Sequence, residues 1–401
     1  MSRWTILAAL SLTRLSFGYQ FQSMASVAPM LSRELGIDQT ATGGLIGLYW
    51  ASGVLVALPG GWLGQRFGDK RMALAGGLLT VLGGLLCALG DSYGVLAAGR
   101  VLAGLGGIVM NIMAVKMLTD WFIGREMGFA LGALFGSFPL GIALGLALQP
   151  PLAQAAGWPA TMLSTAALGA LVIAAIGLVY RAPAGAPRAR APAAVRSREF
   201  LSGMEIALLS LAGMGLALYN GAYLVYVSYA PMLLVASGFG VVEAGLVLAA
   251  TSVISTLTLP LGGHLADRSR RPRAVLFGGT LAFCAVVALL PAAAATQSLL
   301  VVAFVTALIS VLGSAPVSPM VGLPSAAVPA ERRSVGLGLF YTWFYVGAAL
   351  CPPFGGWLYD RTGTPAAPVY LNAVFGLMAI ALYALFVLLA KQKRRPQAPF
   401  S

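Results

Sequence analysis

The residue whose type and position point most strongly to chemistry is an arginine inside a long apolar segment. Arg14 lies in the apolar run from residue 4 to residue 31, about 5 Å from the middle of a helix of that length. A charge at that depth in a membrane is costly, so it has to face a cavity or an acidic partner. Arginine carries a planar fork of donors that matches a carboxylate or a similar anion. We therefore predict that Arg14 anchors an anionic substrate. The alternative is a structural arginine that pairs within the protein or extends toward the membrane surface.

The acidic residues are as informative as this arginine. All 12 Asp and Glu residues fall in predicted loops or at the ends of apolar segments, and the single histidine, His264, falls at a segment end. A cation exporter or a proton symporter usually carries a titratable group in its pathway. A cation without an internal counter-charge therefore favours a substrate that is itself the anion.

Other polar and aromatic side chains within the apolar segments are predicted to line the substrate pathway with Arg14. A phenol or an amide well inside a membrane span needs a hydrogen-bond partner, which a cavity or a substrate could supply. The alternative for each is helix packing or a place in an interfacial belt. The predicted lining residues are Tyr19, Gln22, Asn111, Tyr219, Asn220, Tyr223 and Tyr341.

The chain lacks the residue clusters that catalysis, metal binding or nucleic-acid binding would need. Its three cysteines are scattered, without the spacing of a metal site or a disulfide framework. No group of acidic, His or Cys residues lies within the apolar segments, so we predict no catalytic residue, cofactor or metal, and no enzyme. The net charge of +13 arises from basic residues between apolar runs rather than among aromatic residues, so we expect no nucleic-acid partner.

Composition requires that lipid surrounds much of this protein. The chain is 59% hydrophobic and 9% charged, whereas an ordinary soluble domain carries about 25% charged residues. A membrane-spanning helix needs about 20 mostly apolar residues. The predicted fold is an all-α membrane protein with twelve transmembrane helices near residues 4–31, 41–63, 72–90, 95–118, 128–150, 159–180, 204–234, 243–263, 274–294, 298–328, 336–359 and 368–390.

The basic residues predict how the helices are oriented. An even number of spans places both termini on one side, and most of the 25 Lys and Arg residues fall on that side, against only Arg33 and Arg361 on the other. Cytoplasmic loops carry such an excess of basic residues. We therefore predict a multi-pass protein of a bacterial-type inner membrane, with both termini in the cytoplasm.

The chain divides into two halves that resemble each other. Residues 1–180 and 204–401 are predicted as six-helix halves, joined by a cytoplasmic linker, residues 181–203, that is rich in Pro, Ala and Arg. The tetrapeptide APML at residues 28–31 recurs at residues 230–233, and GWLGQR at residues 61–66 has its counterpart GHLADR at the same offset. Parallel six-helix repeats around a central pathway are a known plan of transporters.

Two motifs give these halves a family resemblance. Residues 61–71 read GWLGQRFGDKR and residues 100–107 read RVLAGLGG. With the repeat, they make the chain similar over essentially its whole length to the major facilitator superfamily, which carries the patterns G-x-L-x-D-R-x-G-R-[KR]-[KR] and R-x-x-x-G-x-G-[AG]. Gln65 departs from the first pattern, where the family has aspartate. The second copy keeps the aspartate as Asp267 but has Arg270 in place of a glycine.

The resemblance implies gating roles. In the family the loop motif latches the two halves in the outward-open state, and the arginine of the fourth span has been linked to proton transfer. The alternatives are that the loops only satisfy the positive-inside rule and that Arg100 packs helices through backbone carbonyls. The implied gating residues are Gly61, Arg66, Gly68, Arg71, Arg100, Asp267 and Arg268.

Together these features predict a monomeric transporter that rocks its two halves around a central site. The expected substrate is a small organic or inorganic anion, moved by uniport, by exchange in an antiporter, or with a coupling proton. A first alternative is export of neutral or amphipathic compounds such as drugs or peptides, which the aromatic residues fit but Arg14 does not. A second alternative, from another class, is a membrane receptor that transports nothing.

Overall fold

The computed structural model describes residues 2–56, 64, 66–122, 126–182, 201–268, 271–329 and 332–393. This part of the chain forms thirteen helices and contains no strand. Gly61, Gln65, Arg270 and most of the predicted linker lie outside the described residues, and so does the side chain of Asp267.

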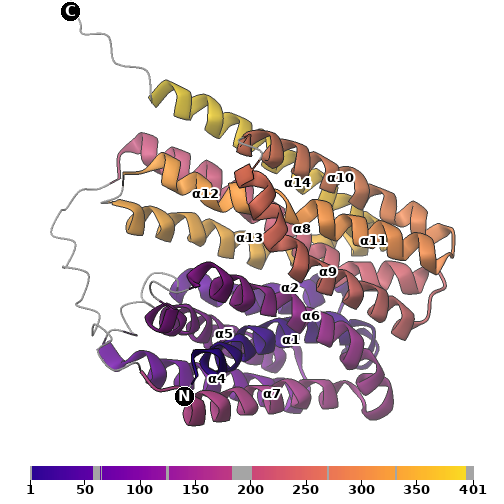
Figure 1. The fold of residues 1–401 in the computed structure, drawn as a ribbon. Helices are drawn as coiled ribbons and strands as arrows, with labels where there is room; N and C mark the ends of the chain where they lie inside the picture. Colours follow the sequence, from indigo (N-terminus) through magenta and orange to yellow (C-terminus); the bar gives the residue numbers. More distant parts are fainter. Residues whose placement is uncertain are drawn as a thin grey trace, which may run out of the picture.

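The helices of each half follow one another with short connections (Figure 1). The first half contains α1 (Arg3–Leu35), α2 (Gln39–Val56), α4 (Asp69–Leu89), α5 (Tyr93–Phe122), α6 (Met127–Ala156) and α7 (Trp158–Val179). The second half contains α8 (Gly203–Ala236), α9 (Val241–Arg268), α10 (Pro272–Ala295), α11 (Leu299–Ser314), α12 (Val317–Ala327), α13 (Arg333–Thr362) and α14 (Ala366–Lys393).

These helices supply the twelve predicted membrane spans. Ten stretches among the described residues are long and apolar enough to cross a bilayer, and one of them, Leu299–Pro324, contains α11 and most of α12. The break between those helices falls at Pro316, whose missing N–H cannot continue the hydrogen bonding of α11. The 33-residue α1 and the described part of α2 complete the twelve. The predicted all-α, twelve-helix membrane fold is thus confirmed.

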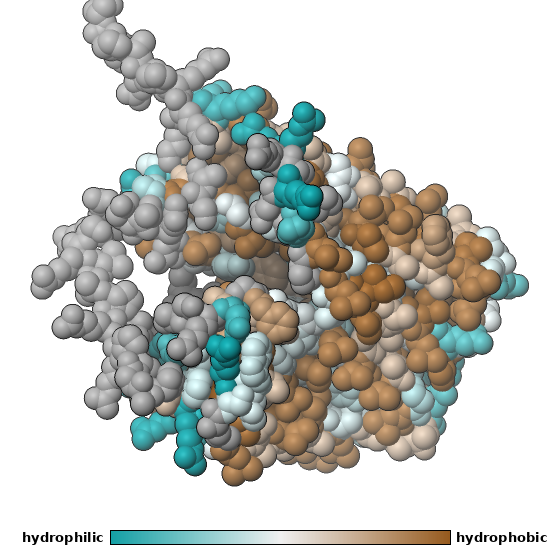
Figure 2. Space-filling view, in the orientation of Figure 1, coloured by the Kyte–Doolittle hydropathy of each residue, from teal (hydrophilic) through white to brown (hydrophobic). Residues whose placement is uncertain are grey.

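The surface of the bundle is that of a membrane protein. Large apolar side chains point outward from many helices, among them Leu89, Leu178 and Leu300, which are 81%, 78% and 83% exposed. Figure 2 shows a broad hydrophobic band with hydrophilic residues toward the two ends of the bundle. In water this band would be unfavourable, whereas the acyl chains of a bilayer solvate it.

The two halves pack internally in the same way and meet along two seams. In the first half α1 packs on α6 and α4 on α5; in the second, α8 packs on α13 and α10 on α11. Between the halves, α2 packs on α13 and α6 on α9. Figure 1 shows the first half below the second, with both termini at one end of the bundle, which we term the terminal end.

The halves are joined tightly at the opposite end, which we term the sealed end. The Asp360 carboxylate of α13 accepts hydrogen bonds from the backbone N–H groups of Gln39 and Thr40, at 3.1 and 2.7 Å, and from the Thr40 hydroxyl, at 2.6 Å. It therefore caps the N-terminus of α2 from the other half. A carboxylate at this position satisfies unpaired N–H groups and interacts favourably with the helix dipole.

Glycines allow the backbones of α2 and α13 to come together near the sealed end. A Cβ atom on Gly47 would lie 2.0 Å from the Ala349 carbonyl oxygen, and one on Gly356 would lie 2.0 Å from the Gln39 carbonyl oxygen. Neither separation is possible for a real side chain, so residues without Cβ are required here. At the terminal end the molecule is instead hollowed between the halves (Figure 2).

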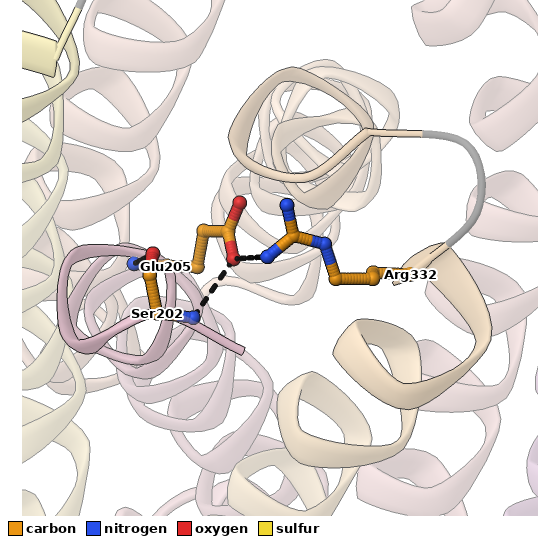
Figure 3. Close-up of polar contacts among 3 residues, drawn as sticks. All are labelled: Ser202, Glu205 and Arg332. Atoms are coloured by element: carbon orange, nitrogen blue, oxygen red, sulfur yellow. Dashed lines mark hydrogen bonds and ion pairs between the residues drawn. The ribbon is translucent and has the colours of Figure 1, made fainter. Parts of the chain in front are cut away.

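The start of α8 shows how the helix ends at the terminal end are held. The Ser202 hydroxyl accepts from the Glu205 backbone N–H, and the Glu205 carboxylate accepts from the Ser202 N–H at 2.9 Å, which together form a capping box. The same carboxylate binds the Arg332 guanidinium at 2.7 Å and so ties α8 to the chain before α13 (Figure 3). In the first half Arg3 pairs with Glu126 at 2.9 Å at the matching position.

Loss of this cap should lower stability measurably. We expect Ser202→Ala to reduce the free energy of unfolding by about 1 kcal/mol, because an N–H at the start of α8 loses its acceptor. The thermal midpoint of the purified protein in detergent measures the change. Ser298 is a suitable control because it precedes α11 without a side-chain cap bond. An equal loss in Ser298→Ala would contradict the capping explanation.

Candidate functional site

Arg14 lies on α1 and has no acidic partner among the described residues. Its guanidinium carbon lies 4.3 Å from the centroid of the Phe135 ring of α6, a separation typical of a cation–π contact. The side chain is only half-buried, and its Nε atom is buried without a hydrogen-bond partner. Within the described part of the chain no carboxylate pairs with it. Arg14 therefore retains both a free charge and unused donors.

The other half contributes two phenols to this site. Tyr341 and Tyr345 lie one turn apart on α13. The Tyr345 ring lies 6.4 Å from the Trp50 ring of α2, which packs at 5.1 Å on Phe17, one turn from Arg14. Tyr341 is 36% exposed, and neither hydroxyl bonds to another described residue. Tyr341 was a predicted lining residue, whereas Tyr345 was not. Tyr341 and Tyr345 are one helical turn apart and therefore lie on the same face of the helix, so a lining role of Tyr341 also predicts one for Tyr345.

Aromatic rings close the space between Arg14 and the sealed end. Trp50 of α2 lies 5.1 Å from Phe17 of α1 and 5.9 Å from both Phe138 of α6 and Phe344 of α13, measured between ring centroids. Phe17 lies one turn beyond Arg14 toward the sealed end, so the ring cluster lies on the sealed-end side of the arginine. Rings from both halves that pack edge to face exclude water from this side of the site.

Two of the predicted lining tyrosines lie within their own halves instead. The Tyr19 hydroxyl lies 2.9 Å from the Ser164 hydroxyl of α7. The Tyr219 hydroxyl donates to the Gly313 carbonyl at 2.6 Å, and its ring packs on Phe283 of α10. Both phenols find the partners that buried hydroxyls require. The helical position of Tyr19 did not reveal its direction, because packing between α1 and α7 decides it.

The amide residues are placed differently. Gln22 donates to the Val227 carbonyl of α8 at 3.4 Å, across the two halves, and its Oε1 atom has no partner. Asn111 donates to Gly107 of its own helix at 2.9 Å and leaves Oδ1 unpaired, while Asn220 leaves Nδ2 unpaired. The Tyr223 hydroxyl is buried without a hydrogen-bond partner among the described residues. No described contact brings any of the four to Arg14.

Arg100 is placed as a structural arginine. It is 1% exposed, and its guanidinium donates to the carbonyls of Leu45, Gln20 and Phe21 at 3.0, 2.9 and 3.4 Å. It also lies 4.3 Å from the centre of the Tyr49 ring. These contacts join α1, α2 and α5, as expected under the packing alternative. The proton-transfer role implied by the family resemblance stays a prediction.

Removal of Arg100 should be strongly destabilising. In Arg100→Leu three buried carbonyl oxygens would lose their donor, and we expect the free energy of unfolding to fall by about 3 kcal/mol or more. Thermal unfolding in detergent measures this loss. Arg71→Leu serves as the control because Arg71 is exposed on α4. A midpoint of Arg100→Leu equal to that of the control would rule out the packing role.

Apart from Arg100, the predicted gating residues lie at the terminal end, as far as they are described. Gly68 precedes α4 with a φ of 89°, a backbone conformation that favours glycine. Asp69 pairs with Lys116 of α5 at 2.6 Å and so fixes α4 to α5. Arg71 and Arg268 are exposed, and Arg66 stacks on Phe67 at 5.7 Å. A latch between the halves built from these residues stays a prediction.

Comparisons with known proteins agree with this architecture. The family model described as Major Facilitator Superfamily matches residues 10–305 and 211–401. The structure is similar to a crystal structure of a D-xylose–proton symporter, with a TM-score of 0.77 and 16% identity over 95% of this chain and 97% of that chain. It is also similar to a bacterial homologue of the human lysosomal transporter Spinster in an inward-facing and occupied conformation, with a TM-score of 0.76 and 19% identity over 99% of each chain.

Several relatives are similar in sequence at 23 to 28% identity. The chain is 27% identical to the nitrite extrusion protein of Bacillus subtilis over 67% of each chain. It is 23% identical to the probable nitrate transporter NarT of Staphylococcus carnosus, over 61% of this chain and 62% of that protein, which is less than two thirds of its length. It is 28% identical to monocarboxylate transporter 11 of Mus musculus over 95% of this chain and 86% of that protein.

Proposed function

Because the chain belongs to the Major Facilitator Superfamily, we propose that it carries a small anion across the plasma membrane by alternating access, with Arg14 as the anchor. The observation that carries this proposal is the arginine itself. Arg14 is a half-buried cation between the two halves, with unused donors and no described acidic partner. A charge that the protein leaves unpaired at that depth is best compensated by a ligand.

The relatives support an anionic substrate. The names of three similar proteins refer to nitrite, nitrate and monocarboxylates. These ions share a small size, a delocalised negative charge and oxygen acceptors, which a guanidinium binds well. No carboxylate faces Arg14 among the described residues, which favours uniport or anion exchange over proton coupling by a group in the site.

The arrangement of the halves supports a rocking mechanism. The seam of α2 and α13 is closed at the sealed end, whereas the terminal end is hollowed. The excess of basic residues at the terminal end favours a cytoplasmic location of both termini. The conformation is then open to the cytoplasm, and rocking of one half against the other would expose Arg14 to the opposite side.

Transport measured in proteoliposomes tests this function. The purified chain would be reconstituted into liposomes that are loaded with nitrite. The uptake of labelled nitrite, nitrate or acetate into these liposomes would then be followed. Anion uptake well above that of empty liposomes is expected. Absence of anion uptake, together with export of lipophilic cationic drugs by the same vesicles, would favour the alternative function and overturn the anion proposal.

A further inference from the structure

We propose that the site selects monovalent oxyanions. Among the described residues Arg14 is its one uncompensated cation, and Tyr341 and Tyr345 are the donors that recognise the oxygen atoms. This inference rests on the proposed function and adds to it the charge of the substrate and the residues that determine specificity. It concerns carboxylates and nitrogen oxyanions of one negative charge, which share the same acceptor geometry.

The charge of the site follows from three basic residues within the spans. Lys116 is compensated by Asp69 at 2.6 Å. Arg100 gives its hydrogen bonds to three backbone carbonyls and is 1% exposed, so a ligand cannot reach it. Arg14 remains, and no described carboxylate lies against it. The site therefore presents a single positive charge to its ligand.

A single charge discriminates between anions by valence. A monovalent anion forms a neutral pair with Arg14, whereas a divalent anion leaves one negative charge beside the rings of Phe135 and Trp50. The faces of aromatic rings are themselves electron-rich. An unpaired charge in such surroundings is strongly unfavourable, so dianions should bind much more weakly.

The two phenols discriminate between anions by shape. Both belong to α13, and the Tyr345 ring lies 6.4 Å from Trp50, which packs on Phe17 one turn from Arg14. Neither hydroxyl is used by another described residue. An anion with two or three oxygen atoms can accept from the guanidinium of the first half and from a phenol of the second half together. A halide of equal charge is spherical and offers no separate oxygen acceptors. Oxyanions alone would therefore bridge the halves through directed hydrogen bonds.

Binding to the full chain in lipid nanodiscs tests both parts of the proposal. Calorimetry at constant ionic strength would compare nitrate, nitrite and acetate with oxalate, malonate and sulfate, and with bromide. We expect each dianion to bind about tenfold more weakly than the monovalent oxyanions, or worse. Tyr345→Phe and Tyr341→Phe should each weaken nitrate and acetate binding by about fivefold and leave bromide binding unchanged. Tyr370→Phe is the matched control, because Tyr370 is exposed on α14.

The outcomes separate this inference from the function on which it rests. If no anion of either charge binds or is transported, the proposed function itself fails. If oxalate or sulfate binds as tightly as acetate, transport of anions stands and selection by valence is wrong. If the two Tyr→Phe variants retain the nitrate affinity of the Tyr370→Phe control, the phenols have no part in recognition. The wild-type ion series needs no variant, so it is decisive even if one variant folds poorly.

Discussion

Arg14→Gln should lower the rate of anion uptake by about a hundredfold or more. The variant keeps an amide donor at a similar position but removes the charge that compensates the anion. Charge-assisted hydrogen bonds contribute about 1.5–3 kcal/mol each, and Arg14 has no described acidic partner that would offset the loss. Uptake of labelled nitrite into proteoliposomes, at equal amounts of reconstituted protein, measures the effect.

The lysine variant separates the charge of Arg14 from its shape. Arg14→Lys keeps the positive charge and loses the planar fork and the stacking on Phe135, so we expect an intermediate loss of about tenfold. Arg361→Gln provides the control, because Arg361 is exposed at the sealed end of α13. Full uptake by both Arg14 variants would remove the anchor role and leave Arg14 as a structural arginine.

Gly47→Ala should stop transport while leaving each half folded. In the present conformation the new methyl group would lie 2.0 Å from the Ala349 carbonyl oxygen of α13. This oxygen belongs to the backbone, so it cannot rotate away as a side chain could. The halves would have to separate at the sealed end, which the proposed mechanism allows in its other state. Alanine is also the better helix former. We therefore expect uptake to fall by about tenfold or more without a loss of thermal stability.

Spin labels on the two halves can measure this shift directly. Arg33→Cys and Arg361→Cys place labels on exposed positions at the sealed end, and the native cysteines Cys87, Cys284 and Cys351 are buried. Gly47→Ala should lengthen the distance between the labels. Gly177→Ala is the matched control, because a Cβ atom there meets nothing within 4 Å. An unchanged distance and full uptake in Gly47→Ala would show that this close approach does not govern the exchange of states.

Asp360 joins α2 and α13 by polar contacts at the sealed end. Its carboxylate caps α2 from the other half, whereas Asp38 caps the same helix from within its own half by accepting from the Ala41 N–H at 2.7 Å. The first contact is lost when the halves separate and the second is not. Asp360 therefore stabilises the conformation that is closed at the sealed end, while Asp38 stabilises α2 in both states. Under the proposed mechanism, the cap from Asp360 would therefore contribute to the relative population of the two conformations.

Hydropathy alone determined the spans, because a bilayer requires about 20 apolar residues for each crossing and the chain meets that requirement repeatedly. The depth of Arg14 in the first span could also be predicted from the sequence, since it depends only on the position of the residue along the helix. The same holds for the two halves, whose repeated motifs are visible without coordinates.

Only the tertiary structure decided which side chain meets which. Arg14 and Arg100 are both intramembrane arginines in the sequence. In the structure Arg14 lies over the Phe135 ring without a described acidic partner, whereas Arg100 donates to three backbone carbonyls. Tyr19 faces α7, and Tyr345, over three hundred residues from Arg14, lies in the ring cluster that begins one turn from it. The cap of α2 by Asp360 joins residues equally distant along the chain. A helical period gives the direction of a side chain relative to its own helix. The neighbour in that direction depends on how α1, α2, α6 and α13 pack, and this is decided by the close approach of backbones at glycine and by ring packing between the halves.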